Sequence, residues 1–156
     1  MVTLTLSLDG AAILLVVGVL GCVQIPMDFQ RRVLSRQATL LAGVAIILVI
    51  ATTSVTSRDL SSIYQTVGCG VVVTVVYALL HQVSPQSLGL GDVLLVVPLT
   101  LAVAHANLRL VLWWQLLAAA TGAMHAVVVT RCRGRASIPF GPHLILTAWA
   151  LLLVGV

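Results

Sequence analysis

The sequence predicts an all-α fold, namely a polytopic membrane helix bundle of about six transmembrane helices that form one domain over residues 1–156. Hydrophobic residues make up 60% of the chain and the mean hydropathy is +1.17. Charged residues make up only 8%, whereas about a quarter is usual in a soluble domain. The apolar residues form long runs that short polar or Gly/Pro-containing connections separate. Because a membrane span takes about 20 apolar residues, this chain has room for six spans and no soluble domain.

The predicted spans differ in the residues that interrupt, precede or occupy them. The first is interrupted near its end by Pro26, and it lacks the basic start and the small-residue cleavage pattern of a secretory signal, so we expect it to be retained. The third contains small residues that allow close helix packing. The fourth follows a Gly-rich turn, and the fifth contains Trp113 and Trp114, which we expect in an external interfacial belt. The six spans cover Leu6 to Met27, Ala38 to Val55, Leu60 to Leu80, Asp92 to Ala106, Leu108 to Thr130 and Ile138 to Val156.

The arginines predict how the bundle is oriented. The chain has eight arginines and no lysine. If the N-terminus lies outside, the cytoplasmic connections contain six arginines and the external side contains only Arg58 and Arg109. Short cytoplasmic loops are enriched in positive charge, so both termini are predicted to lie outside. The six cytoplasmic residues are Arg31, Arg32, Arg36, Arg131, Arg133 and Arg135.

Two of the four aspartates are predicted to lie at the same depth on the cytoplasmic side. Asp28 closes the first span, and Asp92 opens the fourth. Asp92 could simply cap its helix, but an ionisable group at the edge of a span also suggests a functional site. Two carboxylates in contact do not both ionise easily, so one keeps its proton while the other acts as a base towards water, as in aspartic proteases. Gly89 and Gly91 would permit a backbone turn closed to residues with a Cβ, and would leave room for a substrate strand.

Three stretches carry a resemblance to a known family. Asp28 to Thr39 is similar to a motif in which an aspartate precedes an arginine-rich segment and a helix start. Gly89-Leu90-Gly91-Asp92-Val93 fits a GxGD-Val pattern, and Ile138-Pro139-Phe140-Gly141-Pro142 is similar to the segment that opens the last helix of the family. In this order they resemble the GxGD membrane aspartic peptidases, and among them the type IV prepilin peptidases in their short form.

The resemblance implies a single integral membrane peptidase domain over residues 1–156, with Asp28 and Asp92 as its catalytic pair. It further implies that the substrate is a pilin-like precursor whose short basic leader is cut off after a glycine, at the cytoplasmic face of a bacterial cytoplasmic membrane. No methyltransferase activity is expected, because the paired-cysteine region of the longer members is not seen. The residues expected to shape the site or contact substrate are Gly89, Gly91, Arg32, Pro139 and Gly141.

The chain departs from the family pattern at two places. Leu34-Ser35-Arg36 replaces the usual Ile-Pro-Asn, and Leu94 replaces a common lysine. Neither change removes a carboxylate, although both alter residues near the expected site.

Other classes of function are weighed on composition and spacing. Aromatic residues are 4% of the chain, too few for a nucleic-acid-binding face. The histidines and the three cysteines lack metal-ligand spacing, so no metal and no cofactor are expected. We expect the protein to be embedded in a lipid bilayer. The alternative to a peptidase is a catalytically inactive membrane scaffold, or a small proton or cation carrier of the same fold. A carrier, however, would place its ionisable groups near mid-membrane and often shows repeats.

Overall fold

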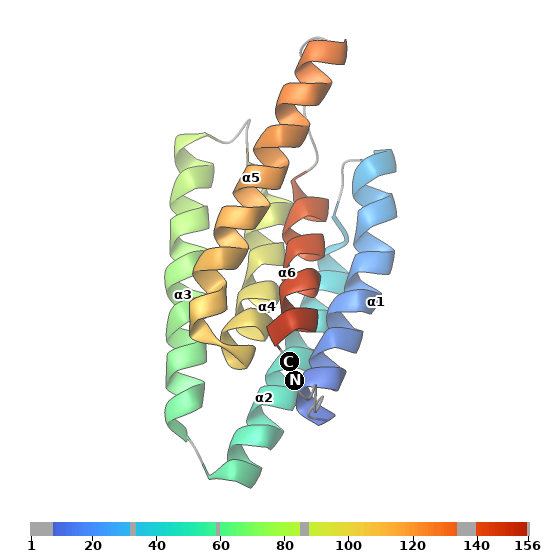
Figure 1. Ribbon diagram of the computed structural model, residues 1–156. Coiled ribbons are helices and arrows are strands. Elements are labelled where there is room, and N and C mark those ends of the chain that lie inside the picture. The colour runs from blue at the N-terminus through green and yellow to red at the C-terminus, as the bar shows by residue number, and fades with distance from the viewer. Residues whose placement is uncertain (1–7, 32–33, 59, 85–87, 134–139, 156) are drawn as a thin grey trace.

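The computed structural model describes residues 8–31, 34–58, 60–84, 88–133 and 140–155, and these residues form helices without any strand. The helices run up and down and pack side by side in one bundle (Figure 1). The start of α1 and the end of α6 lie at the same end of this bundle (Figure 1). In chain order the helices are α1 (Leu8–Arg31), α2 (Arg36–Ser57), α3 (Leu60–Val83), α4 (Leu90–Ala106), α5 (Leu108–Arg133) and α6 (Gly141–Gly155).

Four helices are long and apolar enough to cross a membrane. The spans found are Leu8–Gln30, Arg36–Ser57, Ser61–Val83 and Leu108–Cys132. The other two helices, α4 and α6, are apolar but have only 17 and 15 residues. At a rise of 1.5 Å per residue they are shorter than a hydrocarbon core of about 30 Å. The all-helical fold is therefore confirmed, with four helices long and apolar enough to span a membrane, and the count of six crossings stays a prediction.

The centre of the bundle is α4, which contacts each of the five other helices. Its sequence is apolar on all sides, as expected for a helix that other helices surround. Leu95, Val96 and Leu99 of α4 are fully buried, and they pack into one core with residues such as Ile46 of α2 and Leu144 of α6. The outer helices instead expose large apolar side chains. Leu41, Val72 and Leu112 are among them, and such a surface fits contact with lipid.

Helix ends are where the predicted spans differ from the structure. Pro26 does not interrupt the first helix, because α1 continues through it to Arg31 and so includes Asp28 in its last turns. Membrane helices tolerate such prolines when neighbouring groups satisfy the freed backbone. The fourth helix begins at Leu90, two residues before the predicted Asp92, because Gly89 already serves as its N-cap.

The prediction for Trp114 is wrong. Its side chain is fully buried, and its indole N–H donates a hydrogen bond of 2.9 Å to the carbonyl oxygen of Leu144 in α6. Trp113 is 61% exposed and stays on the surface. Neighbouring residues of a helix point in directions about 100° apart, so only one of two adjacent tryptophans can face the bundle interior.

Candidate active site

Asp28 and Asp92 line the same cavity, which has a volume of about 520 Å³. Asp28 comes from the last turns of α1 and Asp92 from the first turn of α4. Only 6% of Asp28 and 8% of Asp92 is exposed, so the structure places two carboxyl groups largely out of solvent. The remaining lining residues are Leu34, Arg36, Gly89, Leu90, Gly91 and Leu94.

Gly141, the first residue of α6, shows how close the two carboxyl groups are. A Cβ atom at Gly141 would lie 2.9 Å from Oδ2 of Asp28 and 3.4 Å from Oδ1 of Asp92. The two oxygens are therefore no farther apart than the sum of these distances. The absent side chain at residue 141 lets α6 begin directly against the pair.

The carboxyl group of Asp92 has two contacts of different kinds. Its Oδ2 accepts a hydrogen bond of 3.3 Å from the backbone N–H of Gly89. The backbone N–H of Asp92 in turn donates to the Gly89 carbonyl oxygen at 3.0 Å. These contacts close the first turn of α4, as a helix-capping carboxylate does. The other oxygen, Oδ1, lies on the Asp28 side beside Gly141. Asp92 thus caps its helix and belongs to the pair at the same time.

Asp28 is less well satisfied. Its Oδ2 is buried and has no hydrogen-bond partner among the described residues. A buried carboxylate without a partner is costly, and a second carboxylate beside it adds repulsion when both are charged. A single proton held by the pair relieves both costs, and a bound water or substrate group would supply the missing partner.

Sequence reasoning missed Gln24, which is fully buried in α1 one turn before Asp28. Its Oε1 accepts from the backbone N–H of Ser35 at 2.8 Å, and its Nε2 donates to the Ser35 carbonyl at 2.9 Å and to Oγ1 of Thr39 at 2.8 Å. Ser35 in turn caps α2 by accepting from the N–H of Ala38. The signal was a lone amide in the apolar run from Ala11 to Met27, on the same helix face as Asp28.

The predicted role of the glycines before Asp92 is wrong in its backbone part. Gly89 has φ −72° and ψ 150°, which any residue can adopt. Gly91 lies within α4 and has ordinary helical backbone. Gly91 matters for space instead. A Cβ there would lie 3.0 Å from Cδ1 and 3.2 Å from Cβ of Leu34, so a side chain would push that leucine away.

The remaining predicted site residues divide into two groups. Gly89, Gly91 and Gly141 lie at the carboxyl pair. Arg32 and Pro139 lie outside the described residues. Arg36 was predicted mainly as a topology anchor, with steering of an anionic substrate segment or ionisation of Asp28 as the alternative, and it is exposed and lines the cavity.

Helix α5 fixes the start of α6. A Cβ at Gly122 would lie 2.8 Å from the ring of Phe140, so this ring packs directly on the α5 backbone. Nδ1 of His125 and Nε2 of His143 are 2.9 Å apart, which requires one ring to donate and the other to accept. No group of three His, Cys, Asp or Glu side chains gathers anywhere in the described part of the chain.

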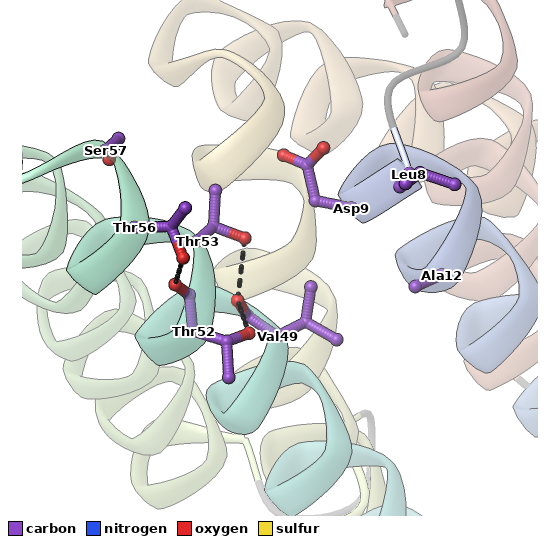
Figure 2. A pocket seen from close by; sticks show the side chains of 8 residues that line it. All are labelled: Leu8, Asp9, Ala12, Val49, Thr52, Thr53, Thr56 and Ser57. Atoms are coloured by element: carbon purple, nitrogen blue, oxygen red, sulfur yellow. Dashed lines mark hydrogen bonds between the residues drawn. The ribbon is translucent and has the colours of Figure 1, made fainter.

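A second cavity, of about 540 Å³, lies between the start of α1 and the end of α2. Figure 2 shows Asp9 on one side of it and a row of threonines on the other. Hydroxyl groups of Thr52, Thr53 and Thr56 donate to carbonyl oxygens of their own helix. Oδ2 of Asp9 lies 3.8 Å from Nε2 of His105. This cavity is lined by one carboxyl group, that of Asp9, whereas the cavity at the other end of the bundle is lined by the two carboxyl groups of Asp28 and Asp92.

Comparison of the chain with protein-family models, with curated proteins and with solved structures finds no match.

Proposed function

We propose that this protein is a membrane aspartic endopeptidase that removes the short leader of pilin-like precursors, with Asp28 and Asp92 as its catalytic pair. One observation carries the proposal: two buried carboxyl groups of different helices converge on the same point beside Gly141. Residues of all three stretches that resemble the GxGD membrane peptidases meet at this point, since Asp28, Asp92 and Gly141 each come from one of them.

The pair can carry out peptide hydrolysis without any other group. The ionised carboxylate takes a proton from a water molecule held between the two side chains, while the protonated one donates a hydrogen bond to the scissile carbonyl oxygen. The water oxygen bonds to the carbonyl carbon, which gives a tetrahedral intermediate. The C–N bond then breaks as a proton passes from the carboxyl pair to the leaving nitrogen. Burial keeps these transfers away from bulk water and strengthens the electrostatic interactions.

The proposed setting is the cytoplasmic membrane of a bacterium. With six crossings and both termini outside, the end of the bundle where α1 ends and α4 begins faces the cytoplasm, and the arginine distribution supports this orientation. A cytoplasmic site fits a precursor whose basic leader stays on that side. The location of both carboxyl groups at one end of the bundle favours a peptidase over a carrier, which needs a site near the midplane.

The test is co-expression of the full chain with a pilin-like precursor encoded nearby, with leader removal followed on a gel. Asp28→Asn and Asp92→Asn replace a carboxyl group by a nearly isosteric amide, and each is expected to lower the cleavage rate at least ~100-fold. Asp9→Asn is the matched control at the other end of the bundle and is expected to cleave like the native protein.

Membrane levels of all variants are compared by blotting. Native-like cleavage by either site variant would disprove the aspartic mechanism. If the native protein cleaves none of the neighbouring pilin-like precursors, the scaffold or carrier alternative takes the place of the proposal.

A further inference from the structure

Leu34 lies between the two glycines of the site. Its Cδ1 approaches Gly91, where a Cβ would lie 3.0 Å away, and its Cδ2 approaches Gly141, where a Cβ would lie 3.3 Å away. The side chain is therefore held between the first turn of α4 and the first turn of α6. It also forms part of the wall of the cavity that contains the carboxyl groups.

Leu34 is also an apolar neighbour of the point where the carboxyl pair converges. Three atoms surround the position of a Cβ at Gly141 within 3.4 Å, and they are Oδ2 of Asp28, Cδ2 of Leu34 and Oδ1 of Asp92. A methyl group thus stands beside the point where the two carboxyl groups converge. Leu90 and Leu94 line the same cavity, but neither is among these nearest atoms, and Leu90 is 64% exposed.

The backbone next to Leu34 is fixed. Ser35 uses both its N–H and its carbonyl group in hydrogen bonds to the buried amide of Gln24, which belongs to the same helix as Asp28. Ser35 also caps α2. These bonds hold the backbone beside Leu34, and Gly91 and Gly141 confine its side chain on two sides. An apolar wall confined in this way discriminates by size, because a substrate side chain that overlaps it has little space to move into.

We propose that Leu34 is a specificity-determining residue that limits the size of the substrate side chain at the cut. This inference rests on the proposed peptidase function. A peptide carbonyl that contacts both carboxyl groups must lie beside the Cδ2 methyl of Leu34, so one of the two residues flanking the cut directs its side chain, or its hydrogen, at that methyl. Glycine or another small residue fits there, and each carbon added to the substrate side chain overlaps further with the side chain of Leu34.

The experiment measures kcat/KM for the full-length protein in detergent on a set of precursor variants. The residue on each side of the cut is changed separately to glycine, alanine and valine. Native protein, Leu34→Ala, the milder Leu34→Val and the control Leu94→Ala, which trims another leucine of the same cavity, are compared. The readout is the ratio of rates for alanine and glycine precursors, so a general loss of activity cancels.

At one of the two positions, Leu34→Ala is expected to raise the alanine-to-glycine ratio about 10-fold or more, since a misfitting methyl group in an apolar pocket is worth about 10- to 200-fold. Leu34→Val should give a smaller rise, and Leu94→Ala none. If Leu34→Ala is not folded, the Leu34→Val ratio decides. Unchanged ratios at both positions, in a protein that cleaves the glycine precursor and loses activity on Asp28→Asn, would overturn the role of Leu34 alone. A native protein that cleaves no precursor would remove the inference together with the proposed function.

Discussion

The two ends of the bundle both contain aspartates but accommodate them differently. At one end the side chain of Asp9 is 32% exposed, and its carboxyl group lies 3.8 Å from an imidazole nitrogen of His105. At the other end Asp28 and Asp92 are buried beside one another, and no described arginine or histidine is within ion-pair distance of either. The first arrangement is a partly exposed contact between a carboxyl group and an imidazole, and contacts of this kind contribute little to stability. The second costs folding free energy, and such a cost is typical of functional sites.

The difference follows from what packs around each aspartate. The end with Asp9 opens into a broad cavity lined by threonine side chains (Figure 2). At the other end Gly141 allows α6 to cover the carboxyl groups, and Leu34 fills the space between Gly141 and Gly91. Close approach of backbone at two glycines therefore makes the buried pair possible. Variants that change this approach should separate the two ends most strongly.

Gly141→Ala should have the largest effect. The new Cβ would meet Oδ2 of Asp28 at 2.9 Å, so the carboxyl group or the start of α6 must move. A displacement of about 1 Å in a catalytic constellation can cost about 100-fold in rate, and we expect a loss of leader cleavage of this size. Gly68→Ala in α3 is the control, because no atom lies within 4 Å of its Cβ position. Native-like cleavage by Gly141→Ala would show that the pair tolerates movement and would contradict the site described above.

Gln24→Leu should have an intermediate effect, on stability first. The substitution removes three hydrogen bonds and leaves the Ser35 N–H without its acceptor, whereas the Ser35 carbonyl still accepts from the N–H and the hydroxyl group of Thr39. An unsatisfied buried polar group costs about 1–3 kcal/mol, so the midpoint of thermal unfolding in detergent should fall by several degrees. Gln30→Leu is the matched control, because Gln30 belongs to the same helix and is exposed. Equal midpoints for the two variants would mean that the hydrogen bonds between Gln24 and Ser35 add nothing to stability.

Asp9→Asn should have the smallest effect. Partly exposed ion pairs contribute about 0–1 kcal/mol, and the N···O distance of 3.8 Å is long for a strong pair. The variant is expected to unfold within a few degrees of the native protein and to cleave precursor at the native rate. A loss of cleavage as large as that of Asp28→Asn would show that the two ends are functionally coupled, and the contrast between them would fail.

Much of the fold could be predicted from the sequence, because long apolar runs specify membrane helices with little ambiguity. The position of Asp28 and Asp92 at one end of the bundle followed from the number of spans between them. Helix ends were less certain, since Pro26 stays inside α1 and Gly89 starts α4 earlier than predicted. These ends depend on capping and on packing against neighbouring helices.

The contacts that shape the site could not be predicted from one sequence. Gln24 reads as one polar residue in an apolar helix, and its partners Ser35 and Thr39 lie across a connection whose path is set by tertiary packing. Leu34 was noted in the sequence only as part of a departure from the family pattern, and the need for glycine at 141 depends on three helices meeting. The individual motifs could be recognised in the sequence, whereas the distances between them are set only when the bundle folds.

The short length of α4 and α6 has a consequence for access to the carboxyl pair. Both helices start nearer the middle of the bundle than the ends of α1, α3 and α5, which extend beyond them (Figure 1). With 17 and 15 residues, they are shorter than the hydrocarbon core of an ordinary bilayer. Their first turns, which contain Asp92 and Gly141, are therefore set back from the ends of α3 and α5. Under the proposed function, a peptide bond has to enter between the longer helices before it can contact the carboxyl pair.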